Sequence, residues 1–126
     1  MYRTFEATFF SHQVLFAERG DINGLMSQYH EHATLILFDT IIVGHECIRL
    51  FLSNHIDYLN QSSLDSIEKY TETNNIISIQ AVITSHLGKQ CISYILILLD
   101  GKLLYQIITF TEQMQHVATH HDLCKV

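Results

Sequence analysis

The second half of the chain contains four runs of β-branched and aromatic residues separated by tight turns, and this pattern most limits the possible folds. The runs cover residues 64–74, 75–88, 89–100 and 102–112, and the turns fall at Asn74-Asn75, Gly88-Lys89 and Asp100-Gly101. Asp-Gly between two such runs is among the stronger short-range signals for a β-hairpin. The pattern predicts an antiparallel meander of four strands.

The first half has the period of helices. A first helix is predicted to begin after a Thr4 cap and to end at Gly20, where glycine closes the last turn. Its phenylalanines fall on one stripe at helical spacing: Phe5, Phe9 and Phe16. Asp21 is expected to act as the N-cap of a short second helix that follows at once, with Ile22, Leu25, Met26 and Tyr29 on one buried face.

Two short strands over residues 33–39 and 40–44 come next, followed by a third helix over residues 45–59. The chain has 126 residues and neither internal repeats nor a low-complexity linker. We therefore expect a single domain over residues 1–112 and a C-terminal tail over residues 113–126.

The amino-acid composition restricts the classes of partner that the chain can bind and the compartment in which it is expected. The formal net charge is −6 and the seven basic residues are scattered, which argues against nucleic acid or an anionic membrane surface as a partner. No apolar run approaches the roughly 18 residues that a membrane span needs, and the N-terminus lacks the pattern of a signal peptide. Cys47, Cys91 and Cys124 show no pairing pattern, so we expect reduced thiols and a cytoplasmic location.

This order of elements resembles the nuclear transport factor 2-like superfamily, which includes SnoaL-like polyketide cyclases and ketosteroid isomerase. The likeness covers about residues 3–112, and it is carried by Gly20, Asp21, Leu25, Tyr29, Ala33, Thr34, Gly44 and Ile48. The resemblance implies an α+β class: a cone-shaped α+β barrel with three N-terminal helices packed on a curved, mixed, mainly antiparallel sheet. It also implies a cavity at the wide end and frequent dimerisation through the outer sheet face.

The catalytic groups of the isomerase are missing at the matching places. Its oxyanion-binding tyrosine would fall on Gln13, its proton-transferring aspartate on Leu37, and its protonated aspartate on Ile95. That chemistry needs a carboxylate base and two donors tuned by an apolar site. We therefore do not expect steroid isomerisation by that mechanism.

The Asp100-Gly101 turn predicts a register in which Ile97 opposes Leu104 and Ile95 opposes Gln106. Strand alternation then separates two faces, and the resemblance turns the face with Ile95 toward the cavity. The opposite face is almost wholly apolar, which predicts a homodimer interface that includes Ile79, Ile83, Tyr94, Leu96, Leu98, Leu103, Tyr105 and Ile107. A one-residue bulge would exchange these assignments beyond it.

The candidate pocket follows from this register. Its predicted lining consists of Phe9, Gln13, Phe16, Leu37, Thr84, Ser93, Ile95, Gln106, Ile108 and Phe110. Such a lining predicts a small hydrophobic ligand with one or two polar groups. Gln13 is equally compatible with a position at the helix surface.

Asp39 and His86 are the candidate proton-transfer residues. The alternatives are a turn position for Asp39 and simple solvent exposure near a turn for His86. His12 and His55 are expected to be partly buried and neutral.

No metal or cofactor is expected. The histidines of His30-Glu31-His32 and of the tail (His116, His120 and His121) lack the further ligands that complete a site. Two alternatives to simple ligand binding remain open. One is a protein-interaction module whose cavity is filled by Phe5, Phe9, Phe16 and Phe110; the other is a SnoaL-like isomerase, cyclase or hydrolase that uses Asp39 or His86.

Overall fold

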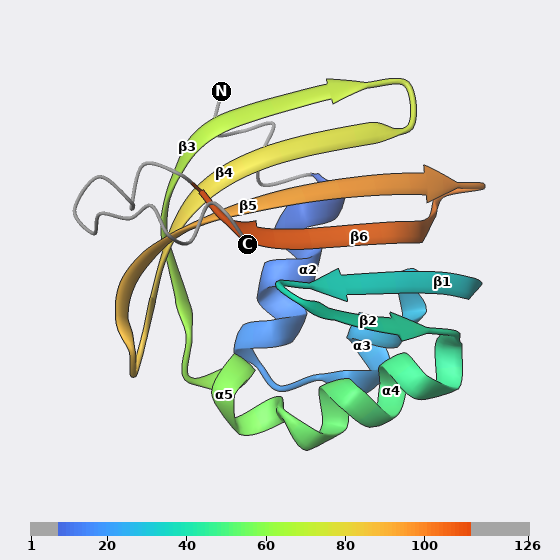
Figure 1. Cartoon of the computed structure of the whole chain (residues 1–126), viewed down its shortest axis with the longest axis horizontal. Helices are drawn as coiled ribbons and strands as arrows, with labels where there is room; N and C mark the ends of the chain where they lie inside the picture. Colours follow the sequence, from blue (N-terminus) through green and yellow to red (C-terminus); the bar gives the residue numbers. More distant parts are fainter. Residues whose placement is uncertain (1–7, 112–126) are drawn as a thin grey trace.

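A computed structural model describes residues 8–111 of the chain. Its helices are α2 (Phe9–Glu18), α3 (Ile22–Ser27), α4 (His45–Asn54) and α5 (Ile56–Asn60). Its strands are β1 (Tyr29–Leu37), β2 (Thr40–Val43), β3 (Ser63–Thr73), β4 (Ile76–Ser85), β5 (Gly88–Leu99) and β6 (Lys102–Phe110). The strands form one six-stranded sheet in the order β2-β1-β6-β5-β4-β3, and the sheet curves around α2 (Figure 1).

The sheet is mixed and mainly antiparallel. Among the described strands, β1 and β6 alone pair in parallel, whereas the other four neighbouring pairs are antiparallel. The helices lie on the concave side of the sheet, with α4 and α5 along its lower edge (Figure 1). The predicted α+β class, with N-terminal helices packed on a curved sheet, is confirmed. Within residues 8–111, no helix is both long and apolar enough to cross a membrane.

The junction between α2 and α3 is built as the sequence predicts. Gly20 has a φ of +67°, its N–H donates to the Ala17 carbonyl at 3.1 Å, and the Asp21 N–H donates to the Phe16 carbonyl at 2.8 Å. This pair of bonds is a Schellman motif, which needs a left-handed residue at the glycine position. The Asp21 carboxylate then accepts from the Gly24 N–H at 2.9 Å, so it caps α3 without any linker.

Three helix boundaries differ from the prediction. The helix α2 begins at Phe9 because Thr8 is its N-cap, accepting from the Ser11 N–H at 3.1 Å; Thr4 and Phe5 lie outside the described residues, as does the predicted tail. The single helix predicted over residues 45–59 divides at His55, whose φ of −116° and ψ of 15° are not helical. Tyr29 starts β1 and does not continue α3.

The β5–β6 hairpin contains the bulge that decides which residues face inward. Leu98 pairs with Leu103 as predicted, but Ile97 then pairs with Tyr105, so Leu104 is the extra residue. Beyond the bulge Ile95 opposes Ile107, and the predicted pairing of Ile95 with Gln106 is wrong. One inserted residue reverses the faces of the strand that follows it.

The core is therefore the apolar face that the sequence analysis placed outside. Ile79, Leu96 and Leu103 are completely buried, together with Ile77 and Ala81. Their burial in the monomer stabilises the fold by removing apolar surface from water. The predicted dimer surface is therefore wrong for Ile79, Leu96 and Leu103, whereas its Tyr105 and Ile107 lie on the outer face of the sheet.

Candidate functional site

An apolar cavity of about 420 Å³ lies between the concave face of the sheet and the helices. Phe10 and Val14 of α2 form one wall, and Leu35 of β1 and Ile92 of β5 form part of the opposite one. Further apolar side chains close the sides: Ala17, Leu25, Leu37, Phe51, Leu52, Leu59, Leu64, Ile83 and Ile108. The walls can hold a molecule with few polar groups.

Part of the predicted lining is in place. Gln13 from α2, Leu37 from β1, and Gln106 and Ile108 from β6 all line the cavity. Asp39 also lines it, from the two-residue turn that joins β1 to β2. Its side chain is exposed, so Asp39 combines the two positions considered for it: a turn residue and a carboxylate at the cavity.

Thr84, Ser93 and Ile95 do not line the cavity, contrary to the prediction. They alternate along β4 and β5 with residues that do, so they belong to the other face of the sheet. The hydroxyl of Thr84 instead donates to a carboxylate oxygen of Asp65 on β3, the strand at the edge of the sheet. The error came from aligning Ile95 through a hairpin whose bulge the sequence does not reveal.

Three predicted phenylalanines also lie elsewhere. Phe9 and Phe16 are half-buried and pack against the core without lining the cavity. Phe16 lies so close to α3 that a Cβ added to Gly24 would come within 2.3 Å of its ring. Phe110 is exposed and stacks on Phe38, with ring centroids 4.3 Å apart.

Phe38 adopts an unusual backbone conformation beside the cavity, which it lines. Its φ of +57° lies in the left-handed region, which is rare for a bulky side chain. Such a residue costs on the order of 1–3 kcal/mol and persists only where its surroundings fix it. The Phe110 ring and the backbone bond from the Phe38 N–H to the Ile108 carbonyl, 2.8 Å long, provide that support.

Three buried polar side chains meet at the inner end of the cavity. The Gln106 amide N–H donates to the Gln13 oxygen at 2.9 Å, and the Gln13 amide N–H donates back to the Gln106 oxygen at 3.4 Å. The Tyr29 hydroxyl also donates to the Gln106 oxygen. All three side chains are at most 7% exposed, so this is a buried network in an otherwise apolar interior.

Burial raises the pKa of the Tyr29 phenol well above its ordinary value. The Tyr94 phenol on the sheet wall is shifted in the same direction, first by burial and then by nearby Tyr58. Both phenols stay protonated at neutral pH, and the Tyr29 hydroxyl is a hydrogen-bond donor within the buried network. The Tyr94 ring packs against Phe10, with centroids 4.9 Å apart.

His55 lines the cavity at the break between α4 and α5, and it is exposed, not partly buried as predicted. His12 is exposed as well. The Nδ1 of His55 lies 2.8 Å from the Phe51 carbonyl, and its ring stacks on the Phe51 ring. A carbonyl only accepts, so Nδ1 carries the proton and Nε2 is the basic nitrogen of the neutral ring. His55 was not among the proton-transfer residues predicted from the sequence.

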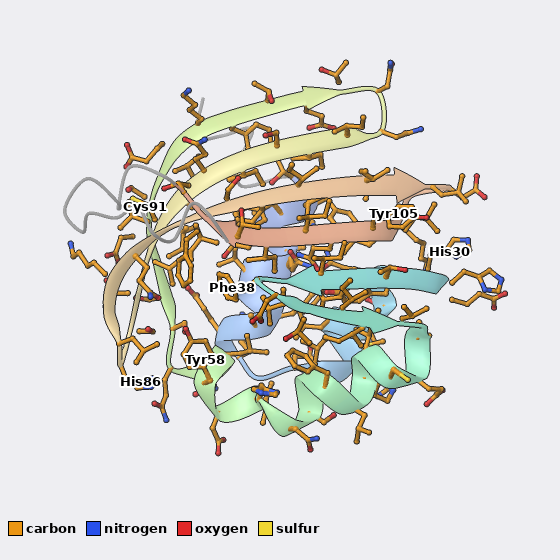
Figure 2. The ribbon with its side chains drawn as sticks, in the orientation of Figure 1. His30, Phe38, Tyr58, His86, Cys91 and Tyr105 are labelled. Atoms are coloured by element: carbon orange, nitrogen blue, oxygen red, sulfur yellow. The ribbon has the colours of Figure 1, made fainter. Side chains whose placement is uncertain are left out.

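His86 does not line the cavity. It is exposed in the β4–β5 turn, and its ring meets the Tyr58 ring of α5 edge-on with centroids 5.4 Å apart (Figure 2). Tyr58 does line the cavity, so His86 lies one side chain away from it.

Charged groups at the cavity are acidic. Glu18 and Asp39 line it, whereas none of its lining residues in the described part of the chain is lysine or arginine. Within residues 8–111 no group of three or more histidine, cysteine or acidic residues is arranged to hold a metal ion. His30 and His32 form only a local ring contact with centroids 5.5 Å apart, and the histidines of the tail lie outside the described residues.

No family model matches the sequence, and no curated protein matches it either. Solved structures do match. A protein from Anabaena variabilis described as nuclear transport factor 2-like superposes with a TM-score of 0.70 at 14% identity, covering 81% of this chain and 83% of that one. The chain has the nuclear transport factor 2-like fold.

Two other structures with this fold have more informative descriptions. TerC, co-crystallised with polyporic acid, is 16% identical with a TM-score of 0.68, covering 86% of this chain and 92% of its own. A candidate polyketide cyclase from Sinorhizobium meliloti is 12% identical with a TM-score of 0.66, covering 78% of this chain and 90% of its own. At these identities the likeness establishes the fold alone.

Proposed function

We propose that this nuclear transport factor 2-like chain is a SnoaL-like protein that binds a small hydrophobic molecule in its cavity. The observation that carries the proposal is an open, apolar space of about 420 Å³ with a few converging polar groups. Ligand sites are commonly 300–1,000 Å³ with this kind of lining. TerC, with the same fold, was crystallised with a small organic molecule, which is consistent with the proposal.

The alternative of a protein-interaction module requires a cavity filled by the chain's own phenylalanines. Phe9, Phe16 and Phe110 do not line the cavity, and Phe5 lies outside the described residues. Three of the four proposed plugs are therefore elsewhere, which favours ligand binding.

A thermal-shift screen of apolar ring compounds tests the proposal. Val14→Trp places an indole in the cavity, whereas Leu15→Trp makes the same change at the next position of α2, which is exposed and does not line the cavity. A ligand at 100 times its Kd stabilises the folded state by about 2.7 kcal/mol. We expect hits that stabilise wild type and Leu15→Trp but not Val14→Trp. Hits that stabilise all three proteins equally would place binding elsewhere.

Proton transfer to a bound ligand is the second candidate function, favoured by the defined tautomer of His55. Its Nε2 and the Asp39 carboxylate are two bases at the cavity, and His86 remains a candidate only through Tyr58. A base of this kind removes a proton from the carbon beside a carbonyl and returns it. The test is exchange of that hydrogen for solvent deuterium in a bound ketone, followed by NMR. Exchange that is unchanged in both His55→Gln and Asp39→Asn would exclude these roles.

We also propose a homodimer through the outer sheet face, which keeps Tyr105 and Ile107 from the first prediction and replaces the residues that are buried in the monomer. The strand registers align an outward row across five strands: Ile41, Ile36, Ile107, Ile95 and Ser78. A second row contains Val43, Thr34, Tyr105, Ile97 and Ile76. Four of these residues are between 44% and 66% exposed, and an apolar patch of this extent is unusual on a monomer.

Sedimentation tests the proposed homodimer: we expect a wild-type dimer at micromolar concentration and a monomer for Ile107→Lys. A monomeric wild type would contradict the proposal. The same dimer is proposed to be cytoplasmic, because Cys47 and Cys91 are free thiols in the described part of the chain.

A further inference from the structure

The glutamine pair has hydrogen-bonding capacity that the protein does not use. Each amide has two N–H hydrogens, and the reciprocal bonds between Gln13 and Gln106 use one from each. The Gln106 oxygen already accepts two bonds, one from Gln13 and one from Tyr29. Among the described residues, one N–H of each glutamine is therefore left without an acceptor. Buried donors of this kind are satisfied by water or by a ligand.

Among the described residues, no lysine or arginine lines the cavity to balance a negative charge. The cavity is lined by the exposed carboxylates of Glu18 and Asp39 and by the buried, protonated phenol of Tyr29, and the exposed imidazole of His55 is the remaining basic side chain. An anionic ligand would lose its hydration in an apolar space, and it would be repelled by those two carboxylates. A neutral oxygen acceptor, in contrast, would take up the two free N–H groups.

We propose that the cavity selects neutral molecules that carry a carbonyl or ether oxygen on an apolar ring system, and that it rejects carboxylic acids. The oxygen sits at the inner end, where Gln13 and Gln106 donate to it, and the rings lie against Phe10 and Val14. This inference rests on the proposed function and adds the charge and polarity of the ligand. The glutamine pair determines selectivity and is not a catalytic group.

Three naphthalenes of similar shape separate these properties. They are 2-acetylnaphthalene, a neutral ketone; 2-isopropylnaphthalene, which lacks the oxygen; and 2-naphthoate, which is an anion at neutral pH. A net hydrogen bond in a buried site is worth roughly 2-fold to 10-fold in affinity. In calorimetric titrations at pH 7 we therefore expect the hydrocarbon to bind about 2-fold to 10-fold more weakly than the ketone. We expect the anion to bind at least about 10-fold more weakly than the ketone.

Two multiple variants connect these differences to the named groups. Gln13→Leu and Gln106→Leu, combined with Tyr29→Phe to remove the hydroxyl that the loss of Gln106 would free, leave no donor at the inner end, so the ketone and the hydrocarbon should bind equally. Glu18→Gln with Asp39→Asn neutralises two exposed side chains outside the core, so we expect it to fold and to improve binding of the anion several-fold relative to the ketone. The second variant keeps the inference testable if the first does not fold.

Each outcome has a distinct meaning. If naphthoate or the hydrocarbon binds wild type with the same affinity as the ketone, the proposed selectivity is wrong, although the cavity still binds ligands. If neutralising Glu18 and Asp39 does not change the affinity for naphthoate, the claim that these carboxylates repel the anion is wrong. If no probe binds, or if Val14→Trp binds all three like wild type, the proposed function fails and this inference fails with it.

Discussion

Replacing Gln106 by leucine should destabilise the protein, although leucine is the more hydrophobic residue. Gln106 is 2% exposed and is the shared partner of Gln13 and Tyr29. Gln106→Leu leaves the Tyr29 hydroxyl and the Gln13 amide buried without a partner. Each unsatisfied buried group costs about 1–3 kcal/mol. Because water in the adjacent cavity can hydrate both groups, we expect the low end of the sum, about 2 kcal/mol.

For a chain of this size, 2 kcal/mol corresponds to a fall in Tm of roughly 6–10 °C. Calorimetry or urea unfolding followed by circular dichroism measures the change. The triple variant Gln13→Leu, Tyr29→Phe and Gln106→Leu removes every member of the network, so most of the lost stability should return. A Gln106→Leu protein within 0.5 kcal/mol of wild type, or a triple variant less stable than the single one, would refute the reasoning.

Three further changes have defined outcomes. Gly24→Ala should cost about 1–3 kcal/mol in urea unfolding, because its Cβ would lie 2.3 Å from the Phe16 ring; an unchanged midpoint would show that the ring moves freely. Burial raises the pKa of Tyr29 and Tyr94. The contribution of these two phenols to the free energy of unfolding is therefore complete below their ordinary pKa of 10.0, and it is lost as the pH rises toward their pKa values in the folded protein. Absorbance near 295 nm should show these two phenols ionising only with alkaline unfolding, not with the exposed tyrosines. Both described cysteines are free, so melts with and without reductant should coincide; a lower Tm on reduction would indicate a disulfide.

Local signals in the sequence were sufficient to predict the junction between α2 and α3. Gly20 and Asp21 have opposite conformational preferences, and their order allows a helix to end and another to begin within two residues. The break at His55 was not predicted, because the apolar spacing of residues 45–59 continues through it and no glycine or proline marks it.

The faces of the sheet were predicted less well because two signals disagreed. Hydrophobicity alone favours Ile79 and Leu96 as the inner face over Gln80 and Ser93, and the structure agrees with it. The resemblance instead placed Ile95 inside through an ungapped hairpin, and the bulge at Leu104 invalidates that alignment. A bulge leaves no reliable mark in a single sequence, so the apolar pattern deserved more weight.

Beyond the bulge the predicted face is correct for Gln106 and Ile108, which is why the glutamine pair was partly foreseen. Tyr29 was assigned to a helix and was missed as a partner of that pair. Its contact with Gln106 depends on the parallel pairing of β1 with β6, which joins residues far apart in the sequence.

The most direct test of the central claim is an NMR titration of the side-chain amides with 2-acetylnaphthalene. The claim is that the free N–H groups of Gln13 and Gln106 bind a neutral ligand, so their resonances should shift in a saturable way. The side-chain amide of Gln28 is a control, because it donates to the Phe9 carbonyl and does not line the cavity. Saturable binding that leaves the Gln13 and Gln106 amides unchanged, with shifts only at outer-face residues such as Ile41, would contradict the account.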